Sequence, residues 1–126
     1  VGLFLSGFPD FDENFVLNKR QKFAACLWSP HSGILLSIKT NQPGIQFYSG
    51  QHLRHKSSKK TLSPFQGLCL ETQAFPNSPN NKKFPSTLVL PNKKYLQQMM
   101  KRLCSHQNFE HTFLHLSMKN FHIPEH

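Results

Sequence analysis

Short apolar runs separated by turn residues fill the chain as far as Tyr95, and this pattern constrains the fold more than any other feature. Runs of this length suit β-strands and are too short for most helices. Strands are expected at 15–17, 23–28, 34–40, 45–48, 67–73 and 86–90. Pro30 and Gly33 form a turn between the second and third strands and predict a β-hairpin. The sequence therefore predicts an all-β fold, part of an antiparallel β-sandwich.

Two longer segments interrupt these strands. Residues 51–66 are polar and basic, which predicts a long loop. The stretch that follows the 67–73 strand contains Pro76, Pro79 and Pro85. Three prolines so close together exclude a helix and favour an extended, fixed path.

The pattern changes after Tyr95. Apolar residues there recur at helical spacing, at Leu96, Met99, Met100 and Leu103. We therefore expect residues 1–95 to belong to the β-sandwich and residues 96–126 to form a divergent tail with helical character. His111 and His115 in this tail would share one face of a helix. No third ligand completes a zinc-binding spacing, so surface histidines are the favoured interpretation and no metal is expected.

The chain has 15 Lys and Arg but only 6 Asp and Glu, which gives a formal net charge of +9. Such an excess of positive charge raises the question of a polyanionic partner. There is no run of five or more cations. The densest basic cluster, residues 55–60, has no aromatic neighbours that would stack on bases, so a solvated basic loop is favoured over a nucleic-acid site. No apolar run reaches the roughly 18–20 residues of a membrane span. We therefore expect neither a nucleic-acid nor a membrane partner.

Cysteine usage bears on the compartment. Cys26, Cys69 and Cys104 are odd in number, lie far apart and form no CxxC motif. Neither a disulfide framework nor a zinc ribbon is indicated, and reduced thiols in the cytoplasm fit best.

Glu71 is the one carboxylate in the stretch 67–81, where an apolar run becomes a Pro/Asn loop. Strand alternation places Glu71 on the same face as Cys69 and Gln73, opposite Leu70. An acid held at the end of a strand is well placed to act as a general base. An exposed edge-strand acid is the simpler alternative.

Three blocks of sequence carry a family resemblance. Residues 11–17 (FDENFVL) are similar to the pattern F-D-H-N-F-x-L, and residues 40–50 (TNQPGIQFYSG) to T-x-x-P-G-V-Q-F-Y-T-G. Residues 67–73 (GLCLETQ), with the segments around 75–80 and 84–91 that follow, match G-x-C-L-E-T-Q, F-P-D-x-P-N and F-P-S-T-x-L-x-P. In this order, the blocks resemble the C-terminal part of the aldose 1-epimerase (galactose mutarotase) family.

The resemblance implies a large antiparallel β-sandwich, the galactose mutarotase-like supersandwich, with a sugar in an open cleft. It implies an isomerase, acting without a cofactor, that interconverts the α and β anomers of free hexoses such as galactose and glucose by general acid–base catalysis. By position in the blocks, Glu71 stands where the family has its general base. Asp12 stands where a carboxylate binds sugar hydroxyls, and Gln46 where the family has an active-site amide.

The chain also departs from the family pattern. The family's general-acid histidine lies in its N-terminal half, and none of the eight histidines here falls in a matching segment, so no general acid is assigned. Glu13 replaces the usual histidine and is expected to alter the charge beside Asp12. We expect the chain alone to be nearly inactive, and to need the N-terminal half or to self-associate.

Two other functions stay open at this point. A non-catalytic carbohydrate-binding remnant of the same fold would bind sugar without interconverting its anomers. A basic nucleic-acid-binding module is the third and least favoured interpretation, and it would show affinity that falls steeply with salt.

Overall fold

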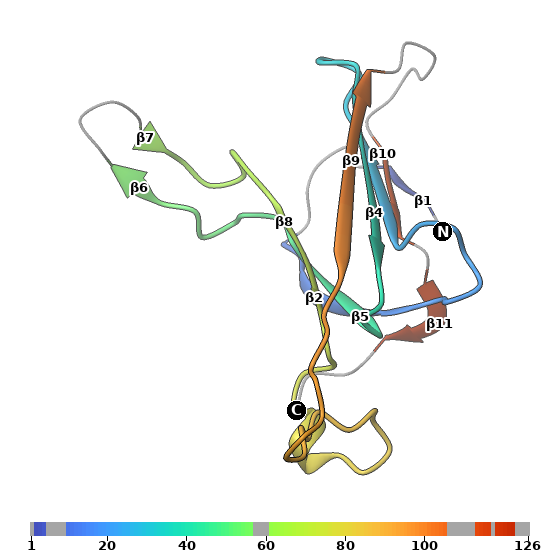
Figure 1. Ribbon diagram of the computed structural model, residues 1–126. Coiled ribbons are helices and arrows are strands. Elements are labelled where there is room, and N and C mark those ends of the chain that lie inside the picture. The colour runs from blue at the N-terminus through green and yellow to red at the C-terminus, as the bar shows by residue number, and fades with distance from the viewer. Residues whose placement is uncertain (1, 5–9, 57–60, 106–112, 117, 123–126) are drawn as a thin grey trace.

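The computed structural model describes residues 2–4, 10–56, 61–105, 113–116 and 118–122, and nearly all of its regular structure is β-strand (Figure 1). One sheet has the order β1 (Gly2–Phe4), β10 (Phe113–Leu116), β3 (Ala25–Trp28), β4 (Ile34–Thr40) and β9 (Met99–Ser105). A second has the order β11 (Met118–His122), β2 (Asp12–Leu17), β5 (Gly44–Tyr48) and β8 (Cys69–Gln73). All pairings in both sheets are antiparallel, which confirms the predicted fold class.

The hydrophobic core joins the two sheets. The four-stranded sheet contributes Phe15, Leu17, Ile45 and Phe47, and the five-stranded sheet, with the residue that leads into β3, contributes Ala24, Ala25 and Ile38. Ala25, Ile45 and Phe47 are fully buried. Because this one cluster draws on inner faces of both sheets, the sheets pack as the two layers of a sandwich.

The predicted hairpin is confirmed in β3 and β4, which pair from Ala25↔Ile38 to Trp28↔Leu35. The turn is closed by a hydrogen bond from the Gly33 N–H to the Ser29 carbonyl oxygen, 2.9 Å. Gly33 has a φ of 64°, a left-handed conformation that glycine adopts without a steric penalty.

The loop at 51–66 contains a short hairpin, β6 (His55–Lys56) and β7 (Thr61–Leu62), which projects away from the sandwich (Figure 1). Gly50 stands at its base with a φ of 82°, and a Cβ there would overlap the carbonyl oxygen of Gly67. The Phe65 N–H donates to the Gly50 carbonyl oxygen, 2.9 Å, and closes the loop. Close backbone approach therefore requires glycine at this position.

The strand predicted at 86–90 is wrong. This segment has no regular secondary structure and no strand partner among the described residues, and Leu88 is 75% exposed. Apolar and β-branched residues favour a strand only where a neighbouring strand takes up their backbone hydrogen bonds.

The helical character predicted after residue 95 is also wrong for the first part of the tail. Residues Met99–Ser105 form strand β9, which pairs with β4 along its whole length, from Thr40↔Met99 to Ile34↔Ser105. The side chain of Asn41 fixes the approach to this strand, because it donates to the Leu96 carbonyl oxygen and accepts from the Gln98 N–H. Sheet pairing along an open edge thus overrides the helical spacing. His111 lies outside the described residues, and His115 lies in β10 rather than in a helix.

The proline-rich loop after β8 does contain a helical element, a single 3₁₀ turn η1 (Ser78–Asn80), where an extended path was expected. Pro79 lies in its first positions, where a missing N–H costs no helical hydrogen bond. The turn is held by the Ser78 hydroxyl, which donates to the Phe75 carbonyl oxygen.

Candidate functional site

The outer face of strands β2, β5 and β8 gathers the polar residues that the sequence singled out. Strand alternation turns the apolar side chains of these strands to the core and leaves a polar face on the other side. Two rows cross the three strands on this face, Asp12–Tyr48–Cys69 and Asn14–Gln46–Glu71. The structure therefore brings Asp12, Gln46 and Glu71 onto one surface, although they lie far apart in the sequence.

Asp12 and Gln46 are in direct contact. The Gln46 side-chain Nε2 donates to the Asp12 Oδ1 over 2.8 Å. An amide that donates to an ionised carboxylate makes a charge-assisted hydrogen bond, stronger than one between neutral groups. Asp12 is exposed and Gln46 is half-buried, so the pair lies at the surface.

Ser49 fixes the backbone next to Asp12. Its hydroxyl accepts from the Phe11 N–H over 2.9 Å, and its own N–H donates to the Phe11 carbonyl oxygen over 2.9 Å. Ser49 is 1% exposed, so these bonds are shielded from water. They join the start of β2 to the end of β5 and hold Asp12 opposite Tyr48.

Glu71 lies on β8, the edge strand of the four-stranded sheet, and its side chain is exposed. Cys69 lies two residues earlier in β8, on the same face of the strand. Burial raises the pKa of the Cys69 thiol, and the charge of Glu71 and a hydrogen bond with it raise the pKa further. The charge of Asp12 acts in the same direction. The strand register puts Cys69 on the same face of the sheet as both carboxylates.

Glu13 lies on the opposite face of β2 from Asp12. It faces Phe47 across the strand pair and is half-buried. The expected change of charge beside Asp12 therefore does not arise on the polar face itself, because adjacent residues of a strand point to opposite sides.

Asn14 is a member of this face that sequence reasoning missed. It is 5% exposed, and neither Oδ1 nor Nδ2 has a hydrogen-bond partner among the described residues. A Cβ built at Gly44 would lie 2.7 Å from Asn14 Oδ1 and 3.0 Å from the Phe75 ring, so Asn14, Gly44 and Phe75 are packed together. Phe75 is itself held edge-on against Phe84, with ring centroids 5.2 Å apart. The available signal was the alternation of β2, which puts Asn14 on the face of Asp12.

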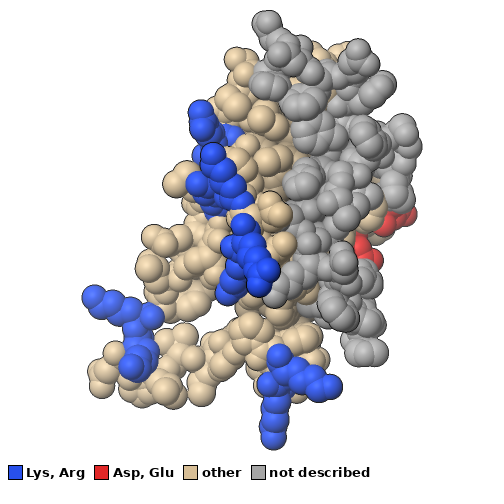
Figure 2. All heavy atoms as spheres, turned by 90° about the vertical axis from the view of Figure 1, so that its right-hand side faces the viewer, with Lys and Arg blue, Asp and Glu red and all other residues tan. Residues whose placement is uncertain are grey.

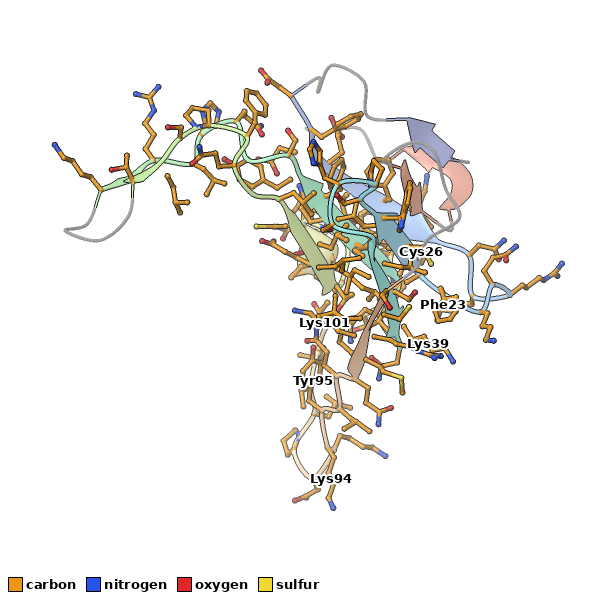
Figure 3. The ribbon with its side chains drawn as sticks, turned by 90° about the horizontal axis from the view of Figure 1, so that it is seen from above. Phe23, Cys26, Lys39, Lys94, Tyr95 and Lys101 are labelled. Atoms are coloured by element: carbon orange, nitrogen blue, oxygen red, sulfur yellow. The ribbon has the colours of Figure 1, made fainter. Side chains whose placement is uncertain are left out.

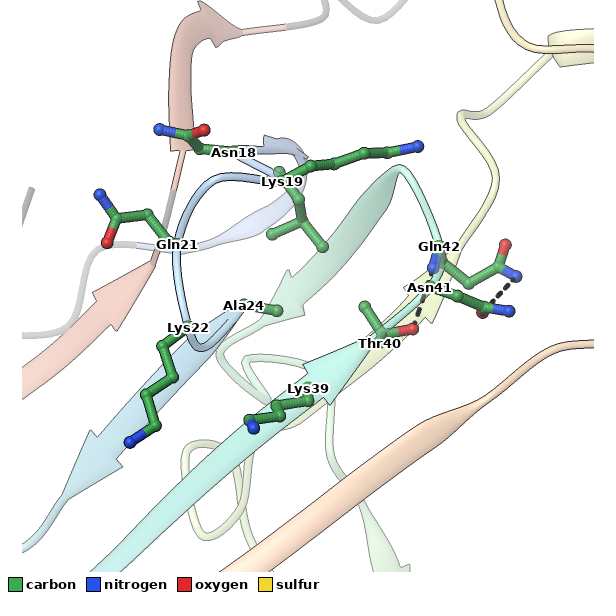
Figure 4. A pocket seen from close by; sticks show the side chains of 10 residues that line it. Asn18, Lys19, Gln21, Lys22, Ala24, Lys39, Thr40, Asn41 and Gln42 are labelled. Atoms are coloured by element: carbon green, nitrogen blue, oxygen red, sulfur yellow. Dashed lines mark hydrogen bonds between the residues drawn. The ribbon is translucent and has the colours of Figure 1, made fainter.

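A hollow of about 400 Å³ lies elsewhere, where β2 ends and the segment to β3 begins (Figure 4). Three lysines, Lys19, Lys22 and Lys39, line it together with neutral side chains, and Asp12, Gln46 and Glu71 are not among its residues. The ammonium group of Lys22 lies 5.5 Å from the centre of the Phe23 ring. That of Lys39 lies 5.4 Å from the same centre, and Figure 3 labels Lys39 and Phe23.

In Figure 2 lysine and arginine side chains form separate groups on the left and lower parts of the view, and acidic side chains occupy a small area near its right-hand edge. The described residues contain no group of three or more His, Cys, Asp and Glu placed to hold a metal ion. No helix in the described part of the chain is long and apolar enough to cross a membrane.

This arrangement suits a ligand rich in hydroxyl groups. Carboxylates accept hydrogen bonds from hydroxyls, and an amide both donates and accepts. A carboxylate in the same row as that amide is placed to take a proton from a bound hydroxyl.

Comparison with known proteins points to one family. The family model of aldose 1-epimerase matches residues 5–100. The galactose mutarotase of Mus musculus is 41% identical over 90 residues, which cover 68% of this chain and 26% of the relative. The aldose 1-epimerase of Escherichia coli strain K12 is 36% identical over 80 residues, 60% of this chain and 23% of the relative. The chain spans about a quarter of the length of these curated relatives.

A solved structure agrees with these matches. The crystal structure of an aldose epimerase homologue from C. elegans superposes with a TM-score of 0.71 and 27% sequence identity. The superposition covers 80% of this chain and 32% of that one. The two antiparallel sheets described above therefore have the fold of a known aldose epimerase homologue.

Proposed function

Because the chain belongs to the aldose 1-epimerase family, we propose that it supplies the carboxylate side of a site that interconverts sugar anomers. The observation that carries the proposal is the outer face of β2, β5 and β8. There Gln46 hydrogen-bonds Asp12 and lies directly opposite Glu71. The proposed substrates are free hexoses such as galactose and glucose.

In this proposal Glu71 is the general base and takes the proton from the anomeric hydroxyl. Loss of that proton allows the bond between the anomeric carbon and the ring oxygen to break as the ring oxygen gains a proton. Rotation about the bond between C1 and C2 and closure on the other face then yield the second anomer. A positioned acid or base contributes about 10²–10⁴-fold to such a step.

Asp12 and Gln46 are proposed to hold the sugar. Asp12 accepts hydrogen bonds from hydroxyl groups, and Gln46 both donates and accepts them. We assign no general acid to this chain, because none of its histidines lies in a block that matches the family pattern. The group that donates the proton to the ring oxygen is proposed to come from polypeptide outside the matched segment. In the mouse relative this remaining polypeptide is about three times as long as the matched segment.

A segment exchange tests this proposal. The matched segment of mouse galactose mutarotase is replaced by this chain, and α-galactose mutarotation is followed by polarimetry. The chimera is expected to accelerate mutarotation, and Glu71→Gln in the chimera is expected to reduce the rate about 10²-fold or more. Asp10→Gln, which removes another exposed acid, is the matched control and is expected to leave the rate unchanged. A Glu71→Gln chimera as active as its parent would overturn the role of Glu71.

The exposed position of Glu71 on an edge strand favours a second candidate, a non-catalytic carbohydrate-binding role. Exposed acids on edge strands are commonly solvated surface groups, and such a group can bind a hydroxyl without taking its proton. This alternative predicts a folded chimera that binds galactose, does not accelerate mutarotation, and binds equally well after Glu71→Gln.

A further inference from the structure

The buried side chain of Asn14 has no role in the site proposed above. This side chain is 5% exposed, and in the part of the chain that the structure describes neither its oxygen nor its nitrogen has a hydrogen-bond partner. Buried amides nearly always have partners, because burying a polar group without one forfeits its bonds to water. Asn14 is such an exception, and it lies on the same face as Asp12, Gln46 and Glu71. Its amide is therefore expected to gain a hydrogen-bond partner when a ligand binds this face.

The strand register identifies that partner. Asn14 lies directly opposite Gln46 in the β2–β5 pair, and Asp12 is the next residue of β2 on the same face. Side chains directly opposite in an antiparallel pair have Cβ atoms about 5 Å apart, within reach of two amides. Yet Gln46 donates to Asp12, its diagonal neighbour, over 2.8 Å. Gln46 thus has two partners within reach on one strand and uses one of them.

We propose that Asn14 is a positioning residue of the sugar site, an alternate partner that receives the Gln46 amide when a sugar hydroxyl takes its place on Asp12. This inference rests on the proposed function, because it needs a hydroxyl-bearing ligand at Asp12. A ligand that displaced Gln46 from Asp12 would otherwise leave that amide without a partner. Transfer to Asn14 gives Gln46 a new bond and removes the two unsatisfied groups of Asn14 at the same time.

The surroundings of Asn14 suit such an exchange. Gly44 has no side chain, and the space that a Cβ would fill is bordered by Asn14 Oδ1 and the edge of the Phe75 ring. Rotation about the last side-chain torsion turns the Asn14 amide from Gly44 toward Gln46 without moving the backbone, because this torsion is soft. Asn14 therefore acts on the sugar through Gln46 and does not need to touch it.

The test compares the chain with Asn14→Leu, which has nearly the same shape and no polar atoms. Galactose is titrated into each ¹⁵N-labelled protein, and the side-chain amide signal of Gln46 is followed by NMR. In the unmodified chain this signal is expected to shift with galactose. In Asn14→Leu the displaced Gln46 amide has no partner to receive it, so at saturation its signal is expected to shift differently from that of the unmodified chain. Galactose affinity is expected to fall about tenfold, the effect of one hydrogen bond to a neutral group.

Stability separates this role from a structural one. Removing two unsatisfied buried atoms is expected to raise the Tm of Asn14→Leu while it weakens galactose binding. Ser37→Ala is the control, since Ser37 is equally buried, lies in the other sheet and accepts a hydrogen bond from the Cys26 thiol. It is expected to lower the Tm and leave galactose affinity unchanged. Asn14→Ser keeps a polar group opposite Gln46 and is expected to retain part of the Gln46 response.

A lower Tm for Asn14→Leu, or a Gln46 signal that responds to galactose as in the unmodified chain, would overturn the role of Asn14. The same titration with Asp12→Asn distinguishes this failure from failure of the proposed function. If Asp12→Asn weakens galactose binding and Asn14→Leu does not, only the role of Asn14 is wrong. If the unmodified chain shows no galactose response at this face, the proposed function and the inference fail together.

Discussion

Gln46 lies directly opposite Glu71 in the β5–β8 pair, and its side chain reaches across the other side of β5 to the carboxylate of Asp12. One amide therefore stands between two acids that are 59 positions apart in the sequence. Strand β5, which carries Gln46, lies between β2 and β8, and its register with both strands fixes which side chains lie opposite one another. Changes to this face and to the packing beneath it have distinct expected effects.

The first prediction concerns the packing of Asn14. Gly44→Ala is expected to destabilise the fold by about 1–3 kcal/mol, since the new methyl group would collide with Asn14 Oδ1 and the Phe75 ring. Gly67→Ala is the matched control, because its Cβ would lie 3.3 Å from the flexible end of the Leu53 side chain. Its effect is expected to stay within about 0.5 kcal/mol. Urea unfolding of both variants measures the difference, and equal stabilities would contradict the packing described for Asn14.

The second prediction concerns Cys69. Glu71 raises the pKa of the Cys69 thiol, so Glu71→Gln is expected to lower that pKa. A lower pKa leaves more reactive thiolate at a given pH below it, and iodoacetamide is expected to modify Cys69 several-fold faster in mildly alkaline buffer. Mass spectrometry of the peptides gives the rate, with Cys26 and Cys104 as internal controls. An unchanged or slower modification of Cys69 would show that Glu71 does not lie beside the thiol.

The third prediction concerns the open edge of the five-stranded sheet. Leu103 of β9 faces the same side as the buried Ile38, yet it is 69% exposed, because the second sheet does not cover this edge. An apolar edge strand is a surface for self-association. Leu103→Lys is expected to shift the chain toward monomer in sedimentation velocity experiments, and the same change at Leu88, outside the sheet, is expected to have a smaller effect. Association that is unaffected by Leu103→Lys would place the contact elsewhere.

The fourth prediction concerns the charge of Asp12. Asp12→Asn keeps the shape of the side chain but replaces its charge-assisted hydrogen bonds with neutral ones. The difference is about 1 kcal/mol for each bond, so galactose affinity is expected to fall about tenfold. Asp10→Asn makes the same change of charge at an exposed residue outside β2. Isothermal titration with galactose compares the two, and equal affinities would remove Asp12 from the sugar contacts.

Much of the fold was predictable from local pattern. The β3–β4 hairpin followed from two apolar runs around Pro30 and Gly33, and the strand that carries Glu71 followed from alternation, with Leu70 and Thr72 turned inward and Glu71 outward. These features depend on neighbours in the sequence. The family resemblance was carried by motifs in order, and the family match confirms it.

Long-range pairing set the limits of prediction. Leu96, Met99 and Leu103 fit a helical period, but residues Met99–Ser105 instead form strand β9, which pairs with all seven residues of β4. The segment that contains Leu88 had the composition of a strand and no partner among the described residues. The position of Asn14 opposite Gln46 depends on the register of two strands separated by a hairpin, which no local pattern fixes.

A galactose titration of the ¹⁵N-labelled chain, followed through its backbone amide signals, tests the proposed site most directly. We expect saturable shifts centred on Asp12, Gln46 and Glu71, with no such shifts for glycerol, a small polyol that has no sugar ring. We also expect the signals around Lys19, Lys22 and Lys39 to stay in place. Shifts that cluster at those lysines, or no shifts up to the solubility limit of galactose, would contradict the account.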